Sequence, residues 1–173
     1  VHYQFESIHP FYDGNGRTGR IINILYLITQ GLQNLPILYL SNYIIKNKAD
    51  YYRLLQEVRE KNNWEEWLLF MIKGVELTSK ETISLIIQIR DLMMQFKHTL
   101  RNNYKFYSQD LLNNLFKHPY TKIEFIVRDL NVSRITAAKY LNNLSEDGLL
   151  RKEKLGTGNY YINQPLFELL TKR

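Results

Sequence analysis

Twelve consecutive residues of this chain, H-P-F-Y-D-G-N-G-R-T-G-R, bring together side chains that could act on a phosphorylated substrate. His9 is a potential base, and Asp13 supplies a carboxylate for a hard metal ion. Gly14 opens a glycine-rich turn, and Arg17 and Arg20 follow it with two positive charges. A base, a metal ligand and phosphate-binding donors are the parts that a phosphoryl or nucleotidyl transfer requires.

The turn formed by Gly14, Asn15 and Gly16 predicts a backbone site for an anion. Glycine tolerates positive φ, so consecutive N–H groups can converge on one anion. The apolar run that follows predicts a helix, whose free N–H groups and dipole favour negative charge at its start. Arg17 and Arg20 are disfavoured there unless an anion is bound. Their spacing places both guanidinium groups on one helix face, where they can bind phosphate oxygens.

The residues before the turn suit a base and a metal ligand. His9 precedes Pro10, which disfavours helical backbone at His9 and should end the preceding helix there. We therefore expect the imidazole to reach the turn and to accept a proton from an attacking hydroxyl. Asp13 is expected to bind Mg²⁺, which proteins hold through one or two carboxylates together with substrate phosphates. Phe11 is expected to be a core anchor, with Tyr12 pointing the other way.

Two other glycine motifs do not fit. The segment also spells G-x-G-x-x-G, but a dinucleotide site needs a strand before the glycines and an acid about twenty residues later. Gln33 and Asn34 stand where that acid would be. A Walker loop, G-x-x-x-x-G-K-[ST], is absent from the sequence.

The string resembles the signature of the Fic (filamentation induced by cAMP) family, H-x-F-x-[DE]-G-N-G-R-x-x-R. All fixed positions of that signature are matched, by His9, Phe11, Asp13, Gly14, Asn15, Gly16, Arg17 and Arg20. The resemblance implies an all-α Fic core that transfers AMP from ATP to a Ser, Thr or Tyr hydroxyl of a target protein, with release of pyrophosphate. Hydrolytic removal of AMP by the same residues is an alternative.

The resemblance also implies a role for each signature residue. His9 would be the base, and Asp13 would hold Mg²⁺ on the α and β phosphates of ATP. The three turn residues, Gly14, Asn15 and Gly16, would cradle the phosphates. Arg17 would support the β phosphate and Arg20 would reach the γ phosphate, while Phe11 would stay structural.

The rest of the pattern predicts a mainly α chain with two domains. We expect residues 1–100 to be the C-terminal portion of a Fic domain and 101–107 to be a linker. Residues 108–173 are expected to form a winged helix-turn-helix domain with a small β-hairpin. Net charge supports the division, since the residues after 100 carry 12 Lys and Arg against 7 Asp and Glu.

Within the first domain, apolar periodicity predicts separate helices over Trp64–Gly74 and Thr78–Phe96. Ser41 or Asn42 could cap a shorter helix before them. The aromatic pair at 51 and 52 has two interpretations, an adenine pocket or packing between helices.

In the second domain, a helix is predicted from Ser133 to Glu146, and the segment Val132–Leu144 resembles a recognition helix. Its inward positions are expected to be Ile135, Ala138, Leu141 and Leu144. The glycines around Thr157 indicate a hairpin turn. Side chains on the outer helix face and the wing could contact double-stranded DNA, namely Arg134, Thr136, Lys139, Tyr140, Arg151, Lys152 and Lys154. Winged helices also bind proteins, so a DNA- or protein-binding regulator with a vestigial nucleotide pocket is the alternative function.

Composition limits the setting. The chain has no cysteine and no apolar run of about 20 residues, so we expect a cytoplasmic protein without a membrane span. The chain starts eight residues before His9 and lacks the hairpin flap that Fic proteins use to position their target. It also lacks the inhibitory pattern [ST]-x-x-x-E. We therefore expect a fragment that is weakly active alone, with any inhibitory helix in an absent N-terminal part or in a partner protein.

Overall fold

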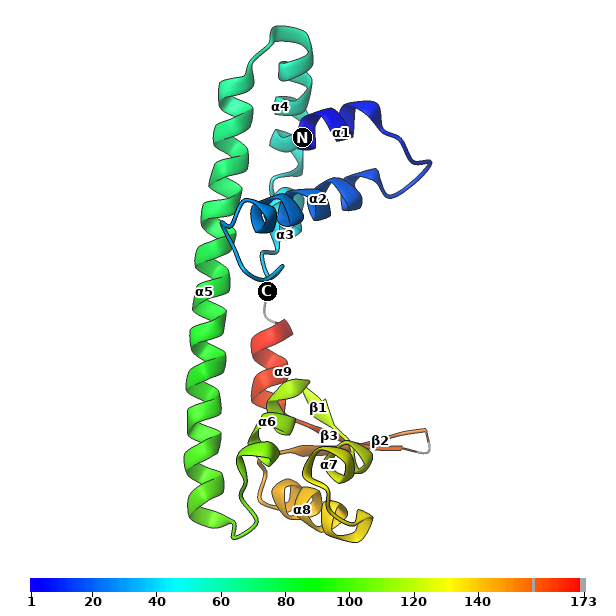
Figure 1. Cartoon of the computed structure of the whole chain (residues 1–173), viewed down its shortest axis with the longest axis vertical. Coiled ribbons are helices and arrows are strands. Elements are labelled where there is room, and N and C mark those ends of the chain that lie inside the picture. Colours follow the sequence, from blue (N-terminus) through cyan, green and yellow to red (C-terminus); the bar gives the residue numbers. More distant parts are fainter. Residues whose placement is uncertain (157, 172–173) are drawn as a thin grey trace. The chain divides into compact units, whose positions relative to one another are not determined.

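The structure is a computed structural model that describes residues 1–156 and 158–171, and it is mainly α-helical as the sequence predicts. It consists of two compact units, Val1–Ser84 and Leu85–Arg173. Figure 1 shows the elements in chain order. The first unit contains α1 (His2–Ile8), α2 (Asn15–Thr29), α3 (Leu40–Lys46), α4 (Lys48–Lys61) and the first part of α5 (Trp64–Asn103).

The core of the first unit lies where α3, α4 and α5 meet. Its buried members are Leu40, Ile44, Tyr51, Leu54, Val58 and Trp67. Removing these apolar side chains from water is the main favourable contribution to the fold of this unit. These contacts fix α3 and α4 against α5. Helix α3 also packs beside α2.

The two helices expected over Trp64–Gly74 and Thr78–Phe96 are one continuous helix, so that prediction was wrong. Gly74 remains helical because it is buried against α3, where a Cβ atom would lie only 2.6 Å from Cδ1 of Tyr43. The Thr78 hydroxyl donates to the carbonyl oxygen of Gly74 at 2.6 Å, which satisfies the side chain inside the helix. Close packing therefore overrides the low helix propensity of glycine.

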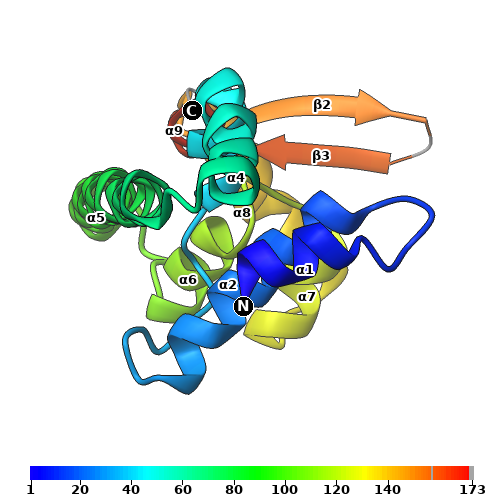
Figure 2. The same ribbon diagram turned by 90° about the horizontal axis from the view of Figure 1, so that it is seen from above.

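The second unit adds a small sheet to its helices. After the end of α5 come α6 (Gln109–Lys117), β1 (Tyr120–Thr121), α7 (Ile123–Leu130), α8 (Arg134–Glu146), β2 (Arg151–Leu155), β3 (Gly158–Ile162) and α9 (Gln164–Thr171). The strands pair antiparallel in the order β1-β3-β2. Figure 2 shows β2 and β3 as neighbouring antiparallel arrows. This order of helices and strands is that of a winged helix.

Capping residues set the helix boundaries of the winged helix. Ser108 accepts a hydrogen bond from the Leu111 N–H at 3.1 Å and caps α6. Ser133 does the same for the Thr136 N–H at 3.1 Å and starts α8 where the sequence predicts. Asn131 has φ 54° in the turn between α7 and α8. Such left-handed backbone is tolerated best by Gly and Asn.

The prediction of which side chains of α8 face the core was wrong for Ile135. Ile135, expected in the core, is 83% exposed, whereas Leu141 and Leu144 are fully buried as expected. Ala137 fills the inward position of the first turn of α8. Positions 137, 141 and 144 follow the helical repeat, and residue 135 lies outside that stripe. Thr157, in the predicted hairpin turn, and Lys172 and Arg173 lie outside the described residues.

The first three residues of the expected linker, 101–107, are helical, because α5 continues to Asn103. The next residue, Tyr104, is only 8% exposed and belongs to the core of the second unit. Its hydroxyl donates to Asp147 at 2.6 Å. The division between the units falls at Ser84 within α5, rather than in the polar stretch after residue 100.

The two sides of α8 provide a matched stability test. We expect Leu141→Ala to lower the free energy of unfolding of the second unit by about 2–5 kcal/mol, because it removes a fully buried side chain. Ile135→Ala should change it by less than about 0.5 kcal/mol, since that side chain is exposed. Hydrogen exchange of the α8 amides in urea measures both. A large loss in Ile135→Ala would contradict the outward position of this side chain.

Candidate functional site

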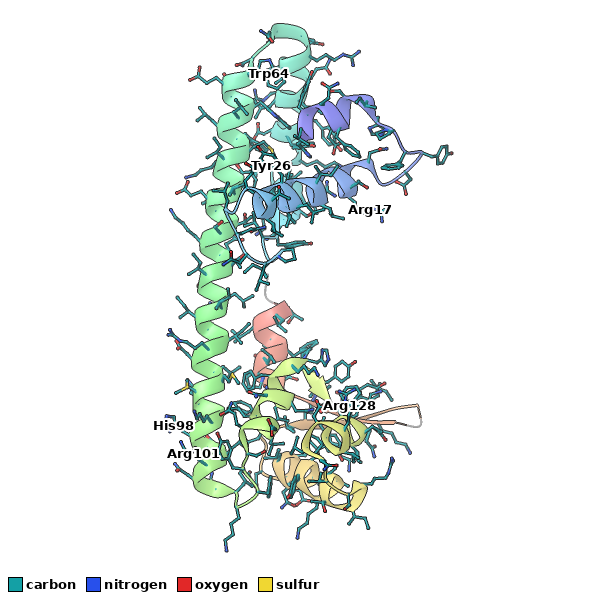
Figure 3. The ribbon with its side chains drawn as sticks, viewed as in Figure 1. Arg17, Tyr26, Trp64, His98, Arg101 and Arg128 are labelled. Atoms are coloured by element: carbon teal, nitrogen blue, oxygen red, sulfur yellow. The ribbon has the colours of Figure 1, made fainter. Side chains whose placement is uncertain are left out.

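The signature residues lie at the junction of α1 and α2. Helix α1 ends at His9, which adopts φ 52° and donates its N–H to the Phe5 carbonyl. Helix α2 begins at Asn15, so six residues, from His9 to Gly14, connect the two helices. Figure 3 labels Arg17 at the start of α2, beside this connection. Pro10 thus ends the helix as predicted, although His9 takes a left-handed rather than an extended conformation.

The Asn15 side chain closes the connection. Its Oδ1 accepts a hydrogen bond from the Phe11 N–H at 2.9 Å, and its Nδ2 donates to the Phe11 carbonyl at 2.6 Å. The residue is only 2% exposed. Both polar groups of one peptide segment are therefore satisfied by one amide side chain. The side chain of Asn15 is used in this way, and what it can offer to a ligand is its backbone N–H.

The turn leaves backbone donors at the start of α2. Gly14 has φ 87°, a conformation that glycine adopts without a Cβ clash, and no side chain caps this helix. The first helical hydrogen bond runs from the Thr18 N–H to the Gly14 carbonyl at 3.0 Å. The N–H groups of the three residues between them have no partner within the helix, and the helix dipole adds partial positive charge there.

Asp13 and Arg17 form an exposed ion pair beside the turn. Arg17 Nη2 lies 3.2 Å from Asp13 Oδ2, and the two side chains are 73% and 84% exposed. Asp13 also accepts the Gly14 N–H at 2.6 Å. An exposed pair of this kind contributes at most about 1 kcal/mol, so a phosphate or a metal ion can compete for either partner.

Arg20 is held more firmly than Arg17. Its Nε donates to the hydroxyl of Ser41 at 2.9 Å, and the side chain is partly buried. Its Nη1 lies 3.2 Å from the point that a Cβ of Gly16 would occupy. Arg17 Nη2 lies 3.6 Å from the corresponding point at Gly14. The two guanidinium groups therefore flank the glycine turn.

His9 is exposed and carries one contact that bears on its protonation. Its Nδ1 lies 3.4 Å from the carbonyl oxygen of Glu6, a long hydrogen bond. A carbonyl oxygen only accepts, so Nδ1 carries the proton in this contact and Nε2 of the neutral ring has a free lone pair. Nε2 is then the atom that can accept a proton from a substrate.

The approach of α1 to α2 depends on Gly19, which is buried. A Cβ at this position would lie 3.0 Å from Cε1 of His2 and would overlap Oε1 of Glu6. Burial is the main cause that lowers the pKa of His2. Burial also raises the pKa of Glu6, which Arg20 partly offsets. Glycine at residue 19 therefore lets α1, and with it His9, lie close to α2.

His2 links this contact to the core. Its Nε2 lies 2.9 Å from the Tyr51 hydroxyl, and its ring is parallel to the Trp67 ring with centroids 6.1 Å apart. Tyr51 is 3% exposed, so it packs between helices, in agreement with the packing interpretation. Tyr52 is 57% exposed. Burial raises the pKa of Tyr51 well above its ordinary value.

Phe11 is not the core anchor that the sequence led us to expect. It is 51% exposed, and its nearest aromatic neighbour is Phe5, with ring centroids 6.2 Å apart. The Asn15 hydrogen bonds to its backbone hold this residue in place, so its ring does not need a core position. Tyr12 is fully exposed, as expected.

Asp13 is the one signature residue suited to a metal ion. Among residues 1–156 and 158–171, no group of three or more His, Cys, Asp or Glu side chains could hold a metal by itself. A single exposed carboxylate beside phosphate-binding donors fits a Mg²⁺ ion that takes its other ligands from a nucleotide and from water.

The sequence did not reveal Ser41 as a partner of Arg20. The two residues lie 21 positions apart, so their contact leaves no local signal in the sequence.

The structure gives internal partners to five of the seven residues considered for DNA contact. Arg134 pairs with Glu124 at 3.0 Å, and Arg151 pairs with Glu153 at 2.9 Å. The remaining contacts are Thr136 with Ser133, Tyr140 stacked on Phe106, and Lys152 with Asn142. Lys139 and Lys154 are exposed on α8 and β2.

Among residues 1–156 and 158–171, none of the helices has the length and the apolar character that a membrane span requires.

Comparisons with known proteins agree with this site. A family model described as "Fic/DOC family" matches residues 1–27, and one described as "Protein adenylyltransferase SoFic-like, C-terminal domain" matches residues 92–166. The chain is also similar to a protein of Aquifex aeolicus (strain VF5) named "Probable protein adenylyltransferase", with 41% identity over 59 residues. The aligned stretch covers 34% of this chain and 16% of that relative.

The buried histidine next to the site predicts a pH dependence of stability. Because burial lowers the pKa of His2 in the folded chain, the unfolded chain binds this proton more readily. The stabilisation is complete above the unfolded pKa of about 6.5 and is lost as pH falls below it. We expect the first unit of the wild-type chain to lose more stability between pH 7.5 and 5.5 than that of His2→Gln.

Tryptophan fluorescence during urea unfolding measures this loss, because Trp64 and Trp67, the two tryptophans of the chain, both lie in the first unit. Tyr51→Phe serves as the control. It removes the hydrogen bond but keeps the histidine, so the pH dependence should persist. Equal slopes for wild type and His2→Gln would show that His2 does not cause the effect.

Proposed function

We propose that this chain, which family models of the Fic/DOC family and of the SoFic-like C-terminal domain match over residues 1–27 and 92–166, is part of a protein adenylyltransferase that transfers AMP from ATP to a hydroxyl side chain of a target protein. One observation supports this most strongly. His9, at the C-terminal end of α1, exposes its imidazole beside the start of α2. The free N–H groups at that start are flanked by the guanidinium groups of Arg17 and Arg20. Because the reaction consumes ATP, the proposal also assigns the protein to the cytoplasm.

The reaction balances with the groups in this site. Nε2 of His9 accepts the proton of a Ser, Thr or Tyr hydroxyl as the hydroxyl oxygen attacks the α-phosphorus of ATP. A bond forms between this oxygen and the α-phosphorus, and the bond from the α-phosphorus to the bridging oxygen of the β phosphate breaks. Pyrophosphate leaves with the electron pair, and the proton on His9 passes to solvent.

The remaining residues bind and orient the nucleotide. The N–H groups at the start of α2 would receive the phosphates, with Arg17 on the β phosphate and Arg20 on the γ phosphate. Asp13 is the residue that would hold Mg²⁺, which when bound offsets phosphate charge. Removal of AMP by hydrolysis would use the same residues, so the direction of the reaction is an outcome of the test.

The test is intact-mass analysis of the chain and candidate target proteins after incubation with ATP and Mg²⁺. We expect the mass of one adenylate to be added, and His9→Ala to slow this at least about 100-fold because it removes the base. His98 is an exposed histidine on α5, so His98→Ala is the matched control, and this variant should be labelled with adenylate as fast as wild type. Equal labelling by His9→Ala would overturn the proposed role. Loss of adenylate from a modified target would instead favour the hydrolase.

For the winged helix we propose binding to double-stranded DNA. The residues after 100 carry a net charge of +5, and α8 exposes Ile135 and Lys139 on one helix face. An apolar side chain can contact a thymine methyl group, and basic side chains can contact phosphates. A protein partner is the competing outcome, as is a regulator in which ATP leaves no adduct and DNA binding alone persists.

Fluorescence anisotropy with a DNA duplex at increasing salt checks this second proposal. We expect binding that weakens steeply with salt, and Lys139→Ala should reduce the slope of log affinity against log salt by about 1. Lys80→Ala removes the same charge from the first unit and should leave the slope unchanged. No binding at low salt would exclude DNA as the partner.

A further inference from the structure

The hydrogen bond between Arg20 and Ser41 joins the signature to a residue that lies 21 positions later in the chain. Nε of Arg20 donates to Oγ of Ser41 at 2.9 Å. At the other edge of the same guanidinium group, Nη1 lies beside Gly16 in the turn. One edge of the planar group is therefore fixed by Ser41, and the opposite edge faces the place where the phosphates would bind.

We infer that Ser41 is a positioning residue, which orients Arg20 so that the Nη groups bind the terminal phosphates of ATP. This inference rests on the proposed function and adds a residue from outside the signature. A guanidinium group has five N–H donors in a rigid fork. The bond to Ser41 uses the donor on Nε and leaves the four on the Nη atoms, which are the donors that form a two-pronged contact with phosphate.

Ser41 can serve this purpose because its own position is fixed. It lies in the first turn of α3, next to Leu40, which is 1% exposed. One turn further, Ile44 is 4% exposed and belongs to the same core cluster. Tyr43 packs against Gly74 of α5. The hydroxyl is thus presented by a helix that is anchored on its other side.

Orientation in advance should strengthen ATP binding. A free arginine side chain has many rotamers, and ordering it on binding reduces affinity. Arg17 shows the contrast, because its side chain is 73% exposed and its partner Asp13 is 84% exposed. The carboxylate of Glu6 attracts Arg20 electrostatically, but the hydrogen bond that orients Nε goes to Ser41.

The test compares nucleotides that differ in their terminal phosphates. Calorimetric titration of the 173-residue chain with Mg²⁺ and either ATP or AMP measures both affinities. We expect Ser41→Ala to weaken ATP binding about tenfold, because a hydrogen bond to a charged group is lost. AMP has no β or γ phosphate, so its affinity should not change. Ser41→Thr keeps the hydroxyl and should restore ATP binding.

Two further variants separate positioning from a structural role. Asn42→Ala alters the neighbouring residue on α3 and should leave ATP binding unchanged. Arg20→Ala should weaken ATP binding more than Ser41→Ala, and the double variant should bind no worse than Arg20→Ala, since Ser41 acts through this arginine. Full additivity of the two losses would overturn the inference.

The remaining outcomes distinguish this inference from the proposed function. If Arg20→Ala weakens ATP binding and Ser41→Ala does not, the inference is wrong while the proposed function stands. If Ser41→Ala weakens ATP and AMP equally, the serine has a structural role only. If the wild-type chain does not bind ATP, or Arg20→Ala has no effect, the proposed nucleotide site itself is wrong and the inference falls with it.

Discussion

The two hydrogen bonds between the Asn15 side chain and the Phe11 backbone determine the shape of the connection on which the site depends. At 2.9 and 2.6 Å they satisfy both polar groups of Phe11 and tie that residue to the first residue of α2. The segment between them must then turn within three residues, and Gly14 meets this requirement with φ 87°. Without the amide, two backbone groups would lose their partners, and the start of α2 would no longer be held beside His9.

The twelve-residue segment from His9 to Arg20 therefore mixes two kinds of residue that the sequence pattern alone does not separate. Asn15 and Gly19 are buried and shape the backbone, the first by hydrogen bonding and the second by allowing α1 to approach α2. His9, Asp13 and Arg17 are exposed and are available to a ligand. The exposed residues have useful geometry only because the buried ones fix the backbone that carries them. A substitution among the buried residues should consequently disturb binding without touching a ligand.

The sequence predicted what is encoded locally and missed what depends on packing. The glycine turn, the start of α2, the cap of α8 by Ser133 and the hairpin all follow from short-range patterns, and the structure confirms them. The continuity of α5 depends on the Tyr43 ring packed against Gly74, which no periodicity reveals. The outward position of Ile135 follows from a phase that Ala137 sets. Ser41 could not be linked to Arg20, because that contact exists only once α3 packs beside α2.

Charge on the winged helix shows why composition alone is a weak guide to a binding surface. Its net charge of +5 suggests a basic face, yet Arg134 and Arg151 are each paired with a nearby glutamate. Such exposed pairs contribute about 0–1 kcal/mol, so a phosphate could replace either glutamate at little cost. An exposed isoleucine on α8 cannot be neutralised in this way, because apolar surface is removed from water only when a partner covers it. Ile135 is therefore the side chain on this helix whose exposure argues most directly for a partner, and the charges around it are better suited to selecting that partner than to holding it.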